Sequence, residues 1–224
     1  VGGVGLGIAM ISFIYSITNT SAAITLLCLA AMPFFTALLA FLFLKEKISF
    51  NVWISIFIAT IGIIIMAFGN TEKNSFIGFI FGIASSIGFS IFSVTLRWRK
   101  ETPKFTTVAV AGLFCFLFAT LMILIKSQPF FASSYNSAMF SLHGTLVCLG
   151  LILYSIGSKA IPAAELTLLS LTEVIGGIFW VWLPLFGINE IPSTNTIVGG
   201  FFLFVSLTYY SLIMRWNKRY IALN

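Results

Sequence analysis

Charged residues are scarce in this chain of 224 residues: Asp, Glu, Lys and Arg make up 8% of it, and aspartate is absent altogether. Soluble domains carry about 25% charged residues, and a soluble chain this poor in charge would expose very large apolar patches to water. Apolar residues make up 59% of the chain, and its mean hydropathy is +1.09. The composition therefore predicts an integral membrane protein and excludes a cytosolic enzyme, a secreted disulfide domain and a disordered tail.

Cysteine is also scarce, and Cys28, Cys115 and Cys148 each lie inside an apolar run without a suitably spaced Cys or His partner. We expect no disulfide, no metal site and no cofactor, and we interpret the three as small packing residues. The sequence lacks an HExxH motif, a paired Cys–His arrangement and a Gly-rich phosphate loop, so we do not expect an enzyme. The net charge of +6 comes from short basic patches between apolar runs, which favours lipid headgroups over nucleic acid as the partner.

Eight apolar runs are long enough to cross the bilayer core of about 30 Å as helices, which takes roughly 20 residues. They are apolar all round, without the alternation of a β-barrel strand. The predicted spans are Val1–Ile17, Ser21–Leu44, Ser49–Gly69, Phe76–Leu96, Thr106–Ile125, Met139–Gly157, Pro162–Phe186 and Ile197–Met214. The sequence therefore predicts an all-α, polytopic transmembrane helical bundle without a soluble domain.

Lys and Arg are distributed unequally between the two sides of this bundle. When successive connections are assigned alternately to the two sides of the membrane, one side receives ten of the twelve Lys and Arg residues and the other side receives two. The first side holds Lys45, Lys47, Arg97, Arg99, Lys100, Lys104, Lys159, Arg215, Lys218 and Arg219, and the other holds Lys73 and Lys126. Because cytoplasmic loops are enriched in Lys and Arg, we expect a multi-pass protein of the plasma (inner) membrane whose C-terminus, a basic tail over 215–224, is cytoplasmic.

An internal repeat divides the chain into two units. Ile14-Tyr15-Ser16-Ile17 resembles Leu153-Tyr154-Ser155-Ile156, and a pair of alanines follows each of them. Residues 1–70 thus match the last three helices of residues 75–214, whose first two helices have no counterpart at the front. Since the chain opens within an apolar run and not with Met, we expect a missing N-terminus and about ten helices in two five-helix units. Units with an odd number of helices insert in opposite senses, as in many secondary transporters, whose substrate site lies near the midplane.

Several short motifs accompany the repeat. The first unit contains Ala22-Ala23, Met32-Pro33, Lys45-Glu46-Lys47-Ile48-Ser49, Gly62 and Gly69, and the second contains Pro162-Ala163-Ala164-Glu165, Thr172-Glu173-Val174 and Asn189-Glu190-Ile191-Pro192-Ser193. They resemble the two EamA domains of the drug/metabolite transporter superfamily over essentially the whole chain. The patterns are degenerate, so they indicate a family and not a substrate.

The resemblance implies a secondary-active transporter, which we expect to export small organic metabolites such as amino acids or drug-like compounds by alternating access between the inverted repeats. Coupling of transport to protons and assembly into a homodimer are two further possibilities that the sequence does not decide. A channel, or a non-transporting membrane assembly or structural protein, is the alternative. The partners expected are a small-molecule substrate and the lipid bilayer.

Two acidic residues are predicted within the hydrocarbon. Glu165 lies in the first turn after Pro162, where a carboxylate favours the positive end of a helix, so a capping role is the simpler interpretation. Glu173 is eleven residues past Pro162, about 16 Å further along a continuous helix. A carboxylate at that depth costs several kcal/mol unless it is paired, hydrated or protonated.

We therefore expect Glu173 to bind substrate or a proton. Trp180 would form a wall of the site, and Gly177 would leave room for a ligand. In the alternative, Glu173 only joins helices through a hydrogen bond to Tyr154 or a serine. The pseudo-symmetric partner is Pro33, which removes a backbone hydrogen bond and either exposes carbonyls to a cavity or simply bends the helix.

Small residues recur every fourth position at Gly78, Gly82, Ser86 and Ser90, a pattern that predicts close helix packing. Since every Lys and Arg maps to a loop or helix end, we expect a cationic, zwitterionic or neutral substrate and not a phosphorylated anion.

Overall fold

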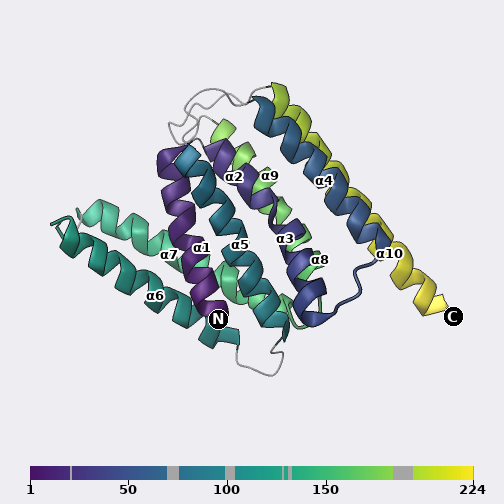
Figure 1. The fold of residues 1–224 in the computed structure, drawn as a ribbon, viewed down its shortest axis with the longest axis horizontal. Helices are drawn as coiled ribbons and strands as arrows, with labels where there is room; N and C mark the ends of the chain where they lie inside the picture. The colour runs from purple at the N-terminus through teal and green to yellow at the C-terminus, as the bar shows by residue number, and fades with distance from the viewer. Residues whose placement is uncertain are drawn as a thin grey trace.

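The protein is a bundle of helices in the computed structural model (Figure 1), which describes residues 1–20, 22–69, 76–98, 104–127, 129–130, 133–183 and 194–223. These residues contain no strand, which confirms the all-α polytopic bundle. The elements are α1 (Gly2–Asn19), α2 (Ala22–Ala30), α3 (Met32–Leu39), the π-helix η1 (Ala40–Leu44), α4 (Phe50–Gly69), α5 (Phe76–Trp98), α6 (Lys104–Ile125), α7 (Ser134–Gly157), α8 (Ala163–Leu169), α9 (Leu171–Trp182) and α10 (Thr194–Leu223).

Five helical stretches within the described residues are long and apolar enough to cross a membrane. They are Gly2–Asn19, Ile24–Leu44, Phe76–Trp98, Phe105–Ile125 and Ser134–Gly157. Shorter apolar stretches, Phe50–Ile65 and Ile197–Ile213, lie in α4 and α10. The predicted span from Pro162 to Phe186 contains two short helices, α8 and α9, instead of one. Residues 215–223, expected as a tail, continue α10 as helix.

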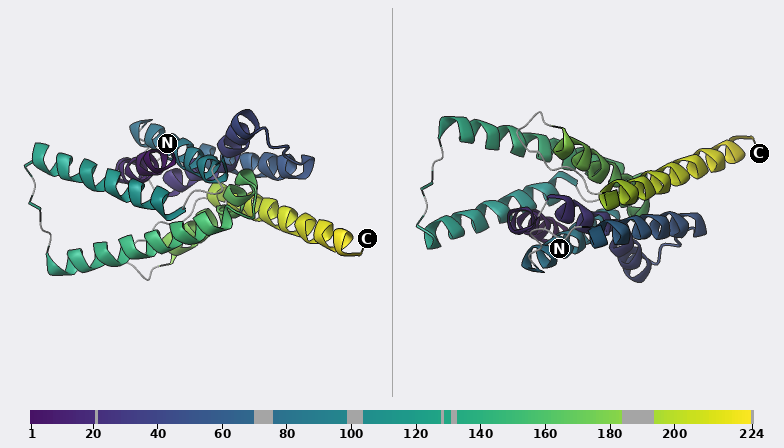
Figure 2. Two further views of the ribbon diagram at one scale, coloured as in Figure 1. Left: turned by 90° about the horizontal axis from the view of Figure 1, so that it is seen from below. Right: turned by 90° about the horizontal axis from the view of Figure 1, so that it is seen from above.

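The helices pair in a definite pattern. α1 packs along α5 and also contacts α6, α4 packs along α10, α2 contacts α9, and α3 contacts α8. Figure 1 shows α4 and α10 side by side, with the two chain termini toward the same side of the bundle. Figure 2 shows α6 and α7 projecting from the rest as two arms.

Small residues make the seam between α1 and α5. A Cβ atom added to Gly88 would lie 2.7 Å from the carbonyl oxygen of Gly5, so the two backbones are in direct contact. The hydroxyl of Ser85 donates to the carbonyl oxygen of Ala9 at 2.9 Å. The hydroxyl of Ser16 donates to the carbonyl oxygen of Gly78 at 2.8 Å. Such close approach is how membrane helices gain van der Waals contact. Of the small residues predicted to pack closely, Gly78 lies in this seam, and a Cβ added to Gly82 would lie 2.7 Å from Cys28 of α2.

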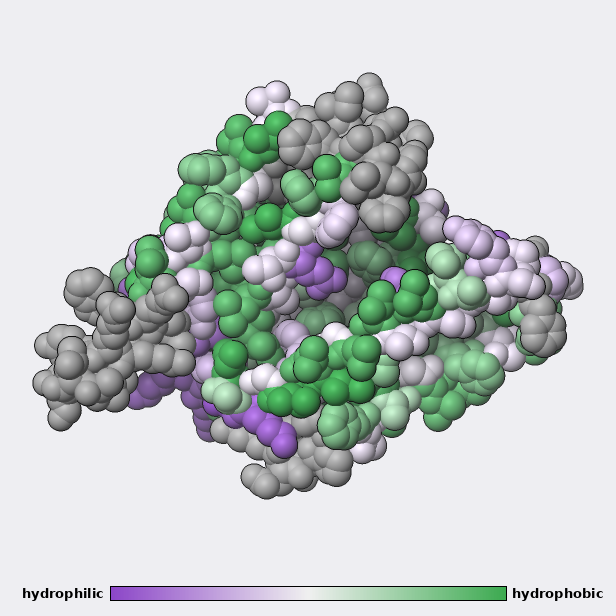
Figure 3. All heavy atoms as spheres, turned by 180° about the vertical axis from the view of Figure 1, so that it is seen from behind, coloured by the Kyte–Doolittle hydropathy of each residue, from purple (hydrophilic) through white to green (hydrophobic). Residues whose placement is uncertain are grey.

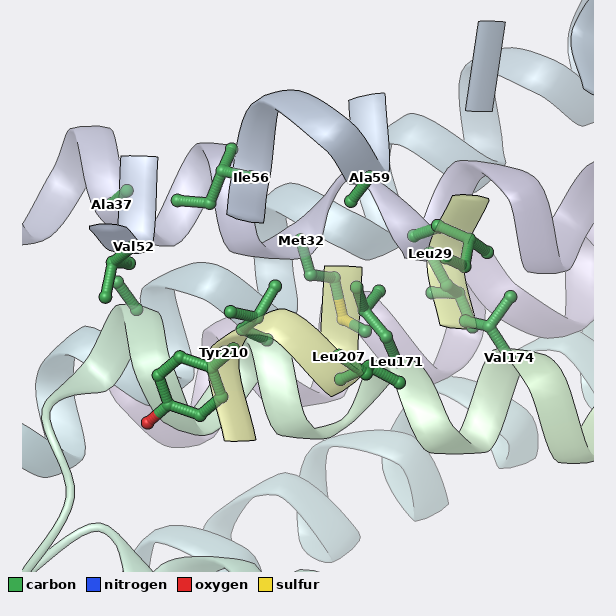
Figure 4. Packing of buried hydrophobic residues seen from close by; sticks show 14 of the residues in the cluster. Leu29, Met32, Ala37, Val52, Ile56, Ala59, Leu171, Val174, Leu207 and Tyr210 are labelled. Atoms are coloured by element: carbon green, nitrogen blue, oxygen red, sulfur yellow. The ribbon is translucent and has the colours of Figure 1, made fainter. Parts of the chain in front are cut away.

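The largest apolar core joins the other helices. Side chains from α2, α3, α4, α8, α9 and α10 meet there, and Figure 4 shows Met32, Leu171 and Leu207 close together. Leu168, Leu171, Val174 and Leu203 are fully buried in it. This core holds the interrupted helices of the two halves against each other.

Apolar side chains also cover much of the outside. Figure 3 shows them over the face seen from behind, and they include Phe116 (65% exposed) and Leu153 (69% exposed) on the two projecting arms. An exterior of this kind suits hydrocarbon and not water, in agreement with a multi-pass membrane protein.

We predict that Gly88→Ala destabilises the protein, because the new Cβ meets backbone atoms of α1. Overpacking of this kind costs about 1–3 kcal/mol, and each kcal/mol lowers Tm by about 2–4 °C in a chain of this size. Thermal unfolding in detergent measures the effect. The control is Gly112→Ala on α6, where the added Cβ meets nothing within 4 Å; an equal fall in Tm for both variants would contradict the seam.

Candidate functional site

Both halves of the molecule contain an interrupted helix. α2 ends at Ala30 and α3 begins at Met32, while α8 ends at Leu169 and α9 begins at Leu171. The linking residues, Ala31 and Ser170, are 139 positions apart, the same separation as Tyr15 and Tyr154. Interrupted helices matter in a membrane because they leave backbone groups that must find other partners.

Pro33 lies in the first turn of α3 and is buried. A proline is tolerated there because the first N–H groups of a helix have no partner within it. Two hydroxyls of α5 bind carbonyls beside the interruption: Ser86 donates to Cys28, and Ser90 donates to Met32 at 3.2 Å. Pro33 is thus buried beside these contacts, and both of its expected roles, exposing carbonyls to a cavity or only bending the helix, stay predictions.

Glu173 lies in the first turn of α9 and not deep within a continuous helix. The sequence-based depth of about 16 Å assumed 1.5 Å per residue from Pro162, and the interruption at Ser170 divides that path. The carboxylate therefore lies near the positive end of a helix, which favours a negative charge. Its side chain is exposed, yet the surrounding helices shield it from solvent in part. This combination is expected in a recess between helices.

Tyr154 is a polar side chain in the neighbourhood of Glu173. Its hydroxyl and that of Ser93 on α5 are 2.7 Å apart, and its ring lies edge-on to Phe89 at 5.1 Å between centroids. The Glu173 carboxylate is close enough to Tyr154 for an electrostatic interaction. Helices α5, α7 and α9 therefore bring a carboxylate, a phenol and aromatic rings to one place.

The remaining predicted residues on α9 are divided between two environments. A Cβ added to Gly177 would lie 3.0 Å from Leu26, so this glycine allows α9 to approach α2. A Cβ added to Gly176 would meet nothing within 4 Å. Trp180 is 54% exposed and lies 6.3 Å from Phe179 in an edge-to-face pair. Gly176, and not Gly177, thus provides free space on this helix.

Glu165 has a partner that the sequence does not suggest. It lies in the first turn of α8, as expected, but its carboxylate accepts a hydrogen bond of 2.6 Å from the hydroxyl of Tyr210 on α10. No capping hydrogen bond is described for this helix start, where Pro162 is the N-cap residue. Glu165 therefore joins α8 to α10 in addition to lying at the positive end of α8, and the capping interpretation stays a prediction.

An ion pair joins the end of α5 to the connection between η1 and α4. Arg97 Nε lies 2.8 Å from Glu46 Oε1, and Arg97 Nη1 donates to the carbonyl of Lys159 at 3.1 Å. Glu46 and Lys159 lie in connections and Arg97 lies in the last turn of α5, all at the end of the bundle that the distribution of Lys and Arg predicts to be cytoplasmic. Glu190, assigned to the outer side, lies outside the described residues.

Ser93, Tyr210 and Arg97 were not predicted as partners of the acidic and aromatic residues. Ser93 lies three residues after the repeat of small residues on α5, which is only a weak sign of a contact between helices. Tyr210 and Arg97 show no local pattern, because their partners Glu165 and Glu46 are remote in sequence. Among the described residues, no three His, Cys, Asp or Glu side chains lie together as a metal site would require.

Comparisons with known proteins agree with this architecture. Residues 1–68 match the model of the EamA-like transporter family. An uncharacterized transporter of Helicobacter pylori strain J99 is 26% identical over 180 residues, which cover 78% of this chain and 60% of that protein. The uncharacterized transporter YdfC of Bacillus subtilis is 28% identical over 195 residues, which cover 81% of this chain and 60% of that protein.

The chain thus spans about 60% of the length of these curated relatives. The fold also resembles that of a protein of known crystal structure with a TM-score of 0.69 at 19% sequence identity. That match covers 96% of this chain and 75% of the other chain.

We predict that Tyr210→Phe destabilises the protein by about 1.5–3 kcal/mol, the usual contribution of a hydrogen bond to a carboxylate. The measurement is thermal unfolding in detergent, alone and combined with Glu165→Gln. Because the two groups share one bond, the effects of the two variants should not add. Tyr209→Phe is the control, since its hydroxyl lies 3.5 Å from Asn51 and makes at most a weak bond. Additive losses would show that the Tyr210–Glu165 contact contributes nothing.

Proposed function

Because the chain belongs to the EamA-like transporter family, we propose that it is a membrane transporter that exports a small organic metabolite, such as an amino acid or a drug-like compound. Transport would be secondary-active and would proceed by alternating access. The observation that carries the proposal is the exposed but partly shielded carboxylate of Glu173 beside Tyr154. A carboxylate inside an apolar bundle is costly to keep, and a ligand or a proton offsets that cost.

The chemistry around Glu173 suits a molecule with one polar group and an apolar body. The carboxylate would meet an amino group or another hydrogen-bond donor, and the phenol of Tyr154 would add a second polar contact. Trp180 and Phe179, both about half exposed, offer aromatic surface on the same helix. An ammonium group would also be attracted to the face of such a ring.

The positive charges favour a cationic, zwitterionic or neutral substrate. Lys45, Lys47, Lys126 and Lys159 lie in connections, and Arg97 lies in the last turn of α5, where it is paired with Glu46. A phosphorylated anion needs a cation or an arginine fork at its binding site. None of these five cations lies on α9, the helix that carries Glu173.

The contacts between the two halves are compatible with alternating access. An inverted repeat would relate α2 to α8 and α3 to α9 by a two-fold axis. The contact between α2 and α9 would then correspond to a contact between α8 and α3, and both contacts are present. The same axis would map the pairing of α4 with α10 onto itself. We propose that residues 1–70 and 75–214 belong to two inverted units, and that the Glu46–Arg97 ion pair holds their cytoplasmic ends together in this conformation.

We predict that Glu173→Gln lowers substrate-dependent flux at least tenfold in vesicles that contain the full-length protein, because the carboxylate that receives the substrate or the proton is lost. Flux of amino acids and cationic drug-like compounds is compared with and without a pH gradient. If a proton couples to transport through Glu173, the variant also loses its dependence on that gradient.

Lys126→Gln is the control for this experiment, since it also removes one charge but lies in a connection. Flux by Glu173→Gln equal to that of the unmodified protein, with the same pH dependence, would remove Glu173 from the mechanism. A protein without any substrate-dependent flux would be an assembly or structural protein, and voltage-driven flux without saturation would indicate a channel.

We predict that the C-terminus is cytoplasmic. A reporter that is active only in the periplasm should be silent when it is fused after Asn224, because ten of the twelve Lys and Arg are assigned to that side and such loops stay inside. The matched control is a truncation fused after Lys126, which should be active. The opposite result in the two fusions would reverse the orientation.

A further inference from the structure

The buried hydroxyl of Ser93 makes two contacts, and together they fix the direction of a short chain of hydrogen bonds. Its oxygen lies 2.9 Å from the carbonyl oxygen of Phe89 and 2.7 Å from the hydroxyl oxygen of Tyr154. A carbonyl can only accept, and a serine hydroxyl has one hydrogen to donate. Ser93 therefore donates to Phe89, four residues before it in the same helix, and accepts the hydrogen of Tyr154.

The phenol of Tyr154 is consequently an acceptor toward any further partner. Its one hydrogen is given to Ser93, so only lone pairs of its oxygen remain for another contact. An ionised Glu173 carboxylate is likewise an acceptor only, and it interacts electrostatically with Tyr154. Two acceptors in one neighbourhood are matched by a ligand group that donates more than one hydrogen.

Aromatic packing holds the Tyr154 ring independently of its hydroxyl. The ring lies edge-on to Phe89 at 5.1 Å and stacked on Phe92 at 6.0 Å between centroids. Phe89 also packs against the apolar cluster that contains Val174, the neighbour of Glu173 on α9 (Figure 4). We therefore expect a variant that lacks only the phenol oxygen to keep the ring in place.

We propose that Ser93 is a positioning residue that sets the specificity of the site at Glu173: by taking the Tyr154 hydrogen, it leaves two acceptors that select a primary ammonium group over a quaternary one. Because the proposed function places the polar group of the substrate at Glu173, this assignment rests on that function. Both kinds of ammonium group carry one positive charge, so attraction to the carboxylate does not distinguish them. Only the primary ammonium has N–H groups to donate to the carboxylate and the phenol.

Removal of the Ser93 hydroxyl changes the hydrogen-bond polarity of the site without changing its charge. In Ser93→Ala the Tyr154 hydrogen has lost its acceptor and is free to turn toward the Glu173 carboxylate. The carboxylate then receives a hydrogen from the protein, and the phenol oxygen no longer depends on a donor from the ligand. A primary ammonium group therefore loses its advantage over a quaternary one.

The experiment uses two probes with the same aromatic body, 2-phenylethylamine and its N,N,N-trimethyl derivative. Their dissociation constants are obtained from the rise of Tm with probe concentration, measured on the full-length protein in detergent. We expect the primary amine to bind at least about tenfold more tightly, as the loss of one or two hydrogen bonds implies. Ser93→Ala should bring the two affinities within about threefold of each other.

Ser85→Ala is the matched control, because Ser85 is another buried serine of α5 but donates to the carbonyl of Ala9; it should keep the ratio of the unmodified protein. If Ser93→Ala does not assemble, Ser93→Cys replaces it, since a thiol fills the space but accepts hydrogen bonds only weakly. An unchanged ratio in the Ser93 variant would show that the trimethyl derivative is excluded by its size, and would overturn the proposal.

A double variant tests whether Ser93 acts through Tyr154. Tyr154→Phe should lower the ratio by itself, and adding Ser93→Ala should then change nothing further, because the two residues share one hydrogen bond. Independent losses, equal affinities of the two probes for the unmodified protein, or no binding of either probe would each overturn the proposal. Binding in detergent is measured without transport, so the flux of Glu173→Gln remains the separate test of the proposed function.

Discussion

Helices inside a bilayer gain little by excluding water from one another, so they associate through close packing and interhelical hydrogen bonds. The α1–α5 seam shows this constraint directly, since glycine and serine bring two backbones within contact distance at Gly5 and Gly88. Hydroxyl groups of α5 bind carbonyls of α1 and of the α2–α3 interruption. One helix thus holds two others in register by the same means. The wider apolar core then fixes α4 and α10 against the interrupted helices, which sets where α9 begins and where Glu173 lies.

The same constraint decides how polar groups are arranged in the apolar bundle. Described serine and threonine hydroxyls in the helices largely bind the carbonyl one turn before them or a carbonyl of a neighbouring helix, as Ser155 and Ser206 do. Glu165 and Tyr154 each have a hydroxyl partner at 2.6–2.7 Å. Glu173 has only an electrostatic relation to Tyr154 and a position at a helix start. The two acidic residues of α8 and α9 therefore differ: Glu165 is hydrogen-bonded to Tyr210, whereas Glu173 lies at a helix start beside Tyr154.

The sequence predicts the helical segments well because a span is a local property: about 20 apolar residues suffice to identify one. The spacing of four residues between the small side chains from Gly78 to Ser90 likewise predicts that this face of α5 packs closely against other helices. Pro33 predicted a break or bend close to the interruption at Ala31, whereas no proline marks the interruption at Ser170. Glu173 was consequently expected within a continuous helix, whereas it lies in the first turn of α9. The Tyr210–Glu165 bond and the Arg97–Glu46 pair could not be predicted, because 45 and 51 residues separate their members and no local pattern links them.

The two interrupted helices lie 139 residues apart, the same offset as Tyr15 and Tyr154. The two sets of helices around them are supported differently. Helix α5 covers the small residues of α1 and contacts α2 and α3, whereas residues 134–146 of α7 are exposed and α9 contacts α2 and α10. Because α7 contacts little else, the position of Tyr154 depends on α5, where the hydroxyl of Ser93 lies 2.7 Å from the Tyr154 hydroxyl and Phe89 and Phe92 lie against its ring. A binding site at Tyr154 and Glu173 would thus depend on α5 for its geometry, because a side chain that contacts a ligand is held precisely only when its neighbours fix it.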